Sequence, residues 1–323
     1  MSAMRPAADP AAFAPARLPF IAGAVLAFVV ASGSRAAEVK TPPLPAPTYP
    51  NVSYGTHERH VLDFWAAPGS SPAPLAVFVH GGGFVGGDKA RLAPGDLAKL
   101  IEGGVSVAAV NYRFLPHAKL PAAFHDVARA VQFLRHQAAA WRINPERVGG
   151  FGGSAGAQIV MFLAFHEDLA DPKSPDPVAR LSTRLACVAP QGGQASMDLP
   201  WLDEHIPFHP QRINRPASLA DWNDKWFGAD GDAARRIIAD ISALALLSPD
   251  DPPLFMNYGM APDGARPADP QAAENWIVHH VAHGLALQRR AQAVGVEVHL
   301  RYPGARVAYA SGVDFLIQKL KVR

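Results

Sequence analysis

A serine set among glycines stands between two apolar segments in the middle of the chain. Gly152-Gly153-Ser154-Ala155-Gly156 follows residues 147–151, which predict a strand, and precedes residues 157–165, which predict a buried helix. On a sharp strand-to-helix turn a serine projects above the sheet, and the glycines on either side let neighbouring backbone pass close by. The amide of Ala155, at the start of the helix, can donate to an oxyanion. The pattern therefore predicts a nucleophilic serine for acyl transfer.

A glycine run follows an earlier predicted strand. His80-Gly81-Gly82-Gly83-Phe84 comes directly after the apolar residues 75–79. Backbone N–H groups in such a run are not covered by side chains and can converge on one oxygen atom, so the run predicts the other half of an oxyanion hole. His80 stands at the end of a strand that aims it away from Ser154, and we expect it to hold the loop rather than to act as a base.

The same glycines also fit a motif from another class of protein. Residues 81–86 satisfy the dinucleotide-binding pattern G-x-G-x-x-G, and residues 150–155 fit its alanine variant. No helix is predicted directly after the first match, because residues 88–94 intervene, so no helix N-terminus would receive a pyrophosphate. The second match contains Ser154, which has no phosphate role in that motif. Nucleophilic catalysis is therefore the favoured interpretation, and no cofactor is expected.

Strands and helices alternate along most of the chain. Further strands are predicted at residues 105–110, 185–189, 254–258 and 296–302, and further helices at residues 124–141 and 285–294. This order predicts an α/β fold with a mostly parallel central sheet and helices on both of its faces. Residues 197–247 break the alternation with aromatic side chains among prolines and charges, so we expect an inserted helical cap there.

Two more motifs lie between the glycine run and the serine motif. They are Asn111-Tyr112-Arg113-Phe114 and Leu120-Pro121-Ala122-Ala123-Phe124. Together the four motifs resemble the hormone-sensitive-lipase-like carboxylesterases and lipases of the α/β-hydrolase superfamily, over a region from about residue 51 to the C-terminus. The resemblance implies an α/β-hydrolase fold, ester cleavage by Ser154, and an oxyanion hole formed by the amides of Gly82, Gly83 and Ala155.

The chain departs from this family at the position of its histidine. The family places that histidine after the strand that matches residues 296–302, where this chain has Arg306 and Val307. No histidine follows His299, which lies within the strand itself. Only the nucleophile and the oxyanion hole can therefore be transferred from the family to this chain.

A base is nevertheless needed, because a serine hydroxyl is a weak nucleophile until its proton is removed. The loop after residues 254–258 ends in His279-His280-Val281-Ala282-His283. Sites in open α/β sheets form at the carboxyl ends of strands, and this loop leaves that end. We therefore expect the base to come from this cluster and choose His280, with His279 and His283 as alternatives.

Several acids could orient that base. The candidates are Asp263, Asp269, Glu274 and Asp198. The spacing of His279 and His283 would also suit a metal pair on a helix, but no third ligand and no H-E-x-x-H pattern is present, so no metal is expected. A solvated helix start is the remaining interpretation of the cluster.

Composition narrows the class of protein. The chain has 323 residues, of which 49% are hydrophobic and 18% charged, which is ordinary globular composition. The net charge is +2 without a long basic run, so nucleic acid is not an expected partner. The one cysteine, Cys187, can form no intrachain disulfide and lies in an apolar run that predicts its burial.

The N-terminus has the pattern of an export signal. Arg5 and Arg17 precede an apolar run at residues 18–31, which is followed by Ser34-Arg35-Ala36, a sequence like a cleavage site. The run is shorter than the roughly twenty residues that a spanning helix needs. We expect a signal peptide at residues 1–36, a proline-rich tether at 37–50, a hydrolase domain at 51–323, and a periplasmic or secreted product without a membrane span.

These observations predict a serine hydrolase that cleaves carboxylic esters through an acyl-enzyme on Ser154. Its substrate would be a small-molecule, carbohydrate or lipid ester. Two alternatives remain open. The missing family histidine is compatible with a catalytically impaired binding protein of the same fold, and one nucleophile can also serve a peptidase.

The export signal gives a direct prediction. N-terminal sequencing of the mature protein should begin near Ala37, because the small residues after the apolar run fit signal-peptide cleavage. A cytoplasmic product that still starts at Met1 or Met4 would contradict it.

Overall fold

The protein is built around an eight-stranded sheet with the strand order β1-β2-β4-β3-β5-β6-β7-β8. The computed structural model describes residues 44–115 and 117–321, so the expected signal peptide and the first part of the expected tether lie outside the described residues. The strands are β1 (Tyr49–Ser53), β2 (Val61–Trp65), β3 (Ala73–Val79), β4 (Ser106–Val110), β5 (Ile143–Gly153), β6 (Cys187–Gln191), β7 (Leu254–Asn257) and β8 (Val298–Arg301).

The sheet is mostly parallel. The β1–β2 and β2–β4 pairs are antiparallel, and all other neighbouring strands run parallel. All five residues of β4 are buried, and they are small or β-branched, as expected of a strand covered on both faces. Cys187, at the start of β6, is fully buried as predicted.

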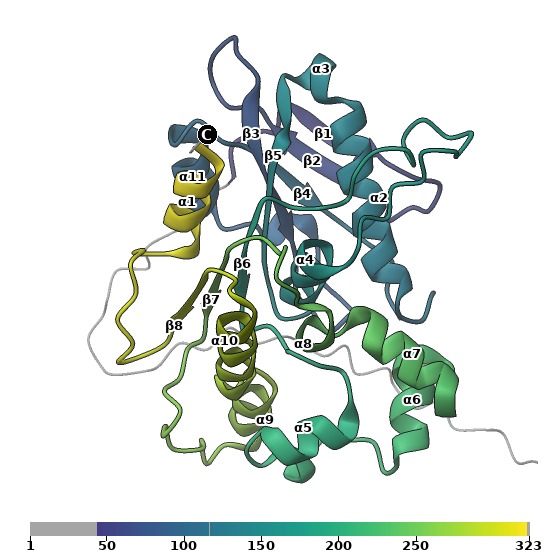
Figure 1. Ribbon diagram of the computed structural model, residues 1–323, viewed down its shortest axis with the longest axis vertical. Coiled ribbons are helices and arrows are strands. Elements are labelled where there is room, and N and C mark those ends of the chain that lie inside the picture. Colours follow the sequence, from purple (N-terminus) through teal and green to yellow (C-terminus); the bar gives the residue numbers. More distant parts are fainter. Residues whose placement is uncertain (1–43, 116, 322–323) are drawn as a thin grey trace, which may run out of the picture. The chain divides into compact units, whose positions relative to one another are not determined.

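Helices cover the two faces of this sheet (Figure 1). On one face lie α1 (Pro94–Glu102) and α11 (Gly312–Lys321), which share an apolar cluster that includes Leu100 and Phe315. On the other lie α2 (Ala122–His136), α4 (Ala155–Phe165) and α10 (Ala282–Val294), whose cluster includes Val131 and Phe162. The predicted α/β-hydrolase architecture is thereby confirmed.

Residues 197–247, between β6 and β7, form a group of short helices. They are α5 (Leu199–His205), the 3₁₀ helix η2 (His209–Gln211), α6 (Leu219–Phe227), α7 (Gly231–Ile241) and α8 (Ala243–Leu246). Figure 1 shows α5, α6 and α7 beyond one end of the strands. The buried Trp222 ties the segment down, because its indole Nε1 donates to the Met197 carbonyl at 2.9 Å. We call this segment the cap.

Several elements differ from the sequence-based expectations or add to them. The helix expected at residues 124–141 is two helices, because α2 ends at His136 and α3 (Ala138–Trp141) follows. The 3₁₀ helix η1 (Lys89–Arg91) and the helix α9 (Pro270–Val278) were not expected. Among the residues with described structure, no helix is both long and apolar enough to cross a bilayer.

Candidate active site

Ser154 lies on a sharp turn between β5 and α4. Its φ of 54° and ψ of −119° put a residue with a side chain in a backbone region that is normally costly. A Cβ on Gly152 would stand 2.2 Å from the Val79 carbonyl oxygen, and one on Gly156 only 2.0 Å from it. Glycine is therefore required on both sides of the serine, because the Val79 carbonyl at the end of β3 lies against both positions.

The glycine run forms a loop directly beside this turn. Gly82 and Gly83 have φ values of +128° and +59°, which turn their peptide units in directions that other residues rarely adopt. Gly83, Ala155 and Ser154 line one cavity of about 150 Å³. Among the described residues, neither the Gly83 amide in its loop nor the Ala155 amide at the start of α4 donates to a loop or turn carbonyl. Both amides are thus available to a ligand oxygen, whereas Gly82 does not line the cavity.

The first and last residues of the glycine run, His80 and Phe84, anchor the loop in the protein interior. His80 is fully buried and stacks on Tyr112 at 4.4 Å, and the Tyr112 hydroxyl donates to the His80 carbonyl at 2.8 Å. Burial lowers the pKa of His80 to about 4. Phe84 is also buried, and its carbonyl accepts from the Leu115 amide at 2.8 Å. His80 therefore has the structural role that its strand-end position predicts.

A histidine reaches Ser154 from the end of α9. His279 Nε2 lies 2.9 Å from Ser154 Oγ, although the two residues are 125 positions apart. On the other side of the ring, Nδ1 lies 3.0 Å from the main-chain carbonyl oxygen of Asn275. A carbonyl can only accept, so Nδ1 carries the proton and Nε2 is free to accept from the serine hydroxyl. This is the tautomer that a general base for Ser154 requires.

The choice of His280 as the base is corrected by this geometry. Its Nδ1 accepts from the Ala282 amide at 3.1 Å, and its ring packs edge-on against Trp276 at 4.4 Å. Its Nε2 is buried and has no hydrogen-bond partner among the residues that the structure describes. Successive residues at a helix end point about 100° apart, so only one of the two neighbouring histidines can face the serine. His279 does, and His280 is directed into the protein.

The third histidine of the cluster lines the cavity without contacting Ser154. His283 Nδ1 accepts from the Ala195 amide at 3.2 Å, and burial lowers its pKa to about 3, so it is neutral at ordinary pH. Among the described residues, no group of three or more histidine, cysteine or carboxylate side chains is arranged to hold a metal ion.

None of the expected acids contacts His279 in the described part of the chain. Asp269 caps α9 by accepting from the Ala272 amide at 2.7 Å. Glu274 forms an ion pair with Arg212 at 2.9 Å. Asp198 precedes α5 in the cap, and Asp263 lies in the loop between β7 and α9. The Asn275 carbonyl occupies the place of an orienting acid, and sequence reasoning missed it because every residue has a carbonyl.

The environment of His279 favours its neutral form. Burial lowers the pKa of His279 below its ordinary value of 6.5, and the positive charge of Arg212 lowers it further. The hydrogen bond to the Asn275 carbonyl acts in the opposite direction but does not outweigh burial. The ring is therefore neutral down to more acidic pH than an ordinary histidine.

Comparison with known proteins identifies the family. The BD-FAE family model, which describes α/β-hydrolase esterases, matches residues 62–267, well over half of the chain. The chain belongs to the BD-FAE family. The predicted resemblance to α/β-hydrolase carboxylesterases is thereby confirmed. The match contains Ser154 and the glycine run, whereas His279 lies beyond its end.

Curated relatives of this BD-FAE protein are named as ester hydrolases. The probable carboxylic ester hydrolase LipM of Mycobacterium tuberculosis is 25% identical over 223 residues, which cover 65% of this chain and 47% of LipM. Esterase LipQ of the same organism is 27% identical over 179 residues, which cover 51% of this chain and 42% of LipQ. The chain thus spans less than half the length of these relatives.

Solved structures support the fold. An acetyl ester-xyloside bifunctional hydrolase from Caldicellulosiruptor lactoaceticus superposes with a TM-score of 0.58 at 23% identity, covering 77% of this chain and 79% of that one. A truncated carbohydrate esterase from gut microbiota superposes with a TM-score of 0.64 at 18% identity, covering 86% of this chain and 100% of that one. At these identities the likeness concerns the fold alone.

The geometry of the glycine loop predicts a specific effect of substitution. In the described part of the chain, and apart from its two neighbours in sequence, no atom lies within 4 Å of a Cβ built on Gly83, so Gly83→Val would act through its φ of +59° and not through overlap. The strained loop should turn its amide away from the cavity, and loss of one such donor lowers kcat by about a hundredfold or more. The measurement is kcat for p-nitrophenyl acetate.

A matched control is Gly231→Val in the cap, where φ is +54° and the space for a Cβ is equally open. It should keep kcat near the wild-type value. Equal kcat values for wild type and a folded Gly83→Val protein would show that this amide has no part in the reaction.

Proposed function

We propose that this protein is a carboxylic ester hydrolase in which Ser154 is the nucleophile and His279 the general base. The observation that carries the proposal is the 2.9 Å contact between His279 Nε2 and Ser154 Oγ. Ser154 shares its cavity with Gly83 and Ala155, whose amides are available to a substrate oxygen. Membership of the BD-FAE family and the names of its relatives support ester hydrolysis as the reaction.

The proposed reaction has two halves. In the first, His279 Nε2 takes the hydroxyl proton of Ser154 while Oγ attacks the ester carbonyl carbon, and the amides of Gly83 and Ala155 stabilise the oxyanion. The intermediate collapses as protonated His279 returns this proton to the departing alcohol oxygen, which leaves an acyl-enzyme. In the second half, His279 deprotonates a water molecule that attacks the acyl carbon, and the acid is released as Ser154 regains its proton.

The end of α9 supplies what a carboxylate supplies in a Ser-His-Asp triad. Replacing the triad aspartate by asparagine in a serine protease costs about 10⁴-fold in kcat because the imidazole adopts the wrong tautomer. Here the Asn275 carbonyl accepts from Nδ1, so the right tautomer is kept without a carboxylate. The helix C-terminus also carries partial negative charge, which favours the imidazolium that forms during the reaction.

The proposed substrate is a small ester, and the proposed location is outside the cytoplasm. The cavity beside Ser154 mixes apolar walls such as Trp222 and Met197 with polar ones such as Gln158 and His283. Such a lining accommodates an acyl or alcohol group that bears both apolar and oxygen-containing parts. The apolar segment at residues 18–31, followed by small residues, supports export to the periplasm or the medium.

The two neighbouring histidines allow a matched test of the base. In hydrolysis of p-nitrophenyl acetate, Ser154→Ala and His279→Gln should each lower kcat/KM by about a thousandfold or more. The His280→Gln variant should stay within a few-fold of wild type, because His280 faces Trp276 instead of Ser154. A larger loss in His280→Gln than in His279→Gln, with both proteins folded, would overturn this assignment.

The depressed pKa of His279 predicts the pH dependence of the reaction. The base must be neutral, and a pKa below 6.5 keeps it neutral down to more acidic pH. The acid limb of kcat/KM should therefore have its midpoint below 6.5, and kcat/KM should reach a plateau above that midpoint as the pH approaches neutrality. Product is best measured by chromatography, since that readout does not itself change with pH. A midpoint at or above the ordinary histidine value would contradict the site described above.

A further inference from the structure

A buried ion pair joins the cap to α9, the helix that carries His279. Arg212, directly after η2, donates from Nε and Nη2 to Glu274 Oε1 at 3.0 and 2.9 Å. The Ile213 amide donates to the other oxygen of the same carboxylate at 3.1 Å. Glu274 is only 6% exposed, so both of its oxygens are held by the cap in a region that excludes most water.

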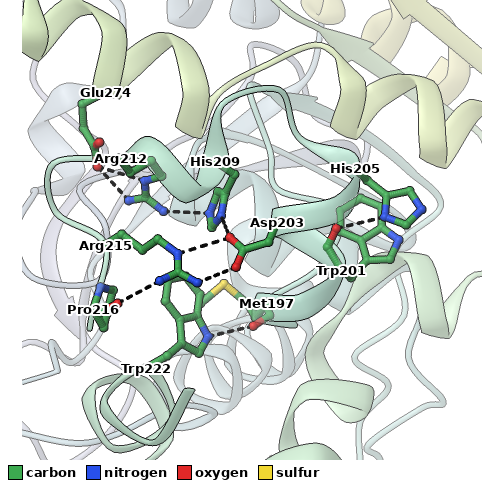
Figure 2. A network of polar contacts seen from close by, with 10 residues as sticks. All are labelled: Met197, Trp201, Asp203, His205, His209, Arg212, Arg215, Pro216, Trp222 and Glu274. Atoms are coloured by element: carbon green, nitrogen blue, oxygen red, sulfur yellow. Dashed lines mark hydrogen bonds and ion pairs between the residues drawn. The ribbon is translucent and has the colours of Figure 1, made fainter. Parts of the chain in front are cut away.

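The partner residues of Arg212 fix its orientation further (Figure 2). Its Nη1 donates to His209 Nε2 at 3.1 Å, and His209 Nδ1 donates to Asp203 at 2.6 Å. Asp203 is in turn paired with Arg215 at 2.5 Å. The two arginines and two carboxylates balance in charge, and burial lowers the pKa of His209, so a neutral histidine bridges two ion pairs.

Glu274 is adjacent to the group that orients the base. The next residue is Asn275, whose carbonyl accepts from His279 Nδ1 at 3.0 Å and from the His279 amide at 3.1 Å. At the end of the same helix, Gln194 Nε2 donates to the Val278 carbonyl at 2.9 Å. The helix end that bears the base is thus held by Arg212, through Glu274, and by Gln194.

We propose that Arg212 is a positioning residue for the base. Through Glu274, Arg212 holds α9 in the place where the Asn275 carbonyl directs His279 to Ser154. The assembled site thereby depends on the cap, which supplies Arg212, as well as on the sheet. This inference rests on the proposed function, since it assigns a role in the reaction that His279 is proposed to perform.

The charges of Arg212 and Glu274 should affect the pH profile of the reaction, which a purely structural role of the pair would leave unchanged. The titratable and charged groups around His279 are Arg212 and His209 from the cap, Glu274 and His280 beside it on the α9 segment, and His283 from α10. Arg212 lowers the pKa of His279, and Glu274 pairs with that positive charge. Removing the positive charge of Arg212 and removing the negative charge of Glu274 should therefore shift the acid limb of the pH profile in opposite directions.

The experiment compares Arg212→Met, Arg212→Lys, Glu274→Gln and the double variant Arg212→Met/Glu274→Gln. Each single variant should lower kcat by about ten- to hundredfold with KM changed only a few-fold, because a displaced base loses rate more than binding. The acid limb should move to higher pH in Arg212→Met and to lower pH in Glu274→Gln. Arg212→Lys keeps the charge without the two-pronged hydrogen bond, so it should lose kcat while its acid limb stays in place.

The double variant guards against misfolding, since it leaves no unpaired buried charge. If the pair acts as one unit, its loss in kcat should be no greater than that of the worse single variant. The matched control is Arg235→Met, which removes an exposed cap arginine that pairs with Asp232 and lies outside the network around Arg212. It should keep kcat and the pH profile near those of wild type.

The outcomes separate this inference from the proposed function. If Arg212→Met and the double variant behave like Arg235→Met while His279→Gln is inactive, the inference is overturned and the proposed function stands. If His279→Gln retains activity, both are overturned. Loss of kcat in Arg212→Met with opposite pH shifts in the two single variants supports the inference.

Discussion

The contact between the end of β3 and the turn at Ser154 sets the geometry of the whole site. The Val79 carbonyl oxygen occupies space where a Cβ on either Gly152 or Gly156 would have to stand. Because β3 and β5 are parallel neighbours, this contact brings the glycine loop after β3 to the turn after β5. Ser154 has its strained φ at this turn, and Gly82 and Gly83 have positive φ values in the adjoining loop. Gly83, Ser154 and Ala155 thereby line the same cavity.

The proposed base reaches this site by a route that differs from that of the resembled carboxylesterases. It comes from a helix end after β7, and the chain has no histidine after β8. A helix C-terminus offers several carbonyls and a partial negative charge, so it can orient an imidazole without a buried carboxylate. The cost is that the helix itself must be held in place. The contacts of Arg212 with Glu274 and of Gln194 with the Val278 carbonyl meet that requirement.

Sequence predicted those parts of the site whose geometry demands glycine. The close approach of Val79 requires Gly152 and Gly156, and that of Gly86 requires Gly82, so the spacing of the glycines indicates the turn and the loop. The choice between His279 and His280 depends on where α9 ends, and a shift of one residue rotates a side chain by about 100°. Nothing in the sequence marks that end, because neither Gly nor Asn, which commonly follow the last residue of a helix, stands directly after Val278.

Two further features had no signal that sequence reasoning could use. A main-chain carbonyl such as that of Asn275 is present at every position, so the search for an acid among Asp263, Asp269, Glu274 and Asp198 could not find it. Arg212 and Glu274 are 62 positions apart and belong to different elements, so only the folded chain brings them together. Sequence did predict the mostly parallel sheet, because buried parallel strands such as β4 are apolar throughout.

The central claim is that Ser154 is a nucleophile activated by His279. The most direct measurement is covalent labelling by a fluorophosphonate, with the modified peptide located by mass spectrometry and the labelling rate followed over time. We predict that the label is found on Ser154, that Ser154→Ala is not labelled, and that His279→Gln is labelled far more slowly. A label on another residue, or equal labelling rates in wild type and His279→Gln, would contradict the account.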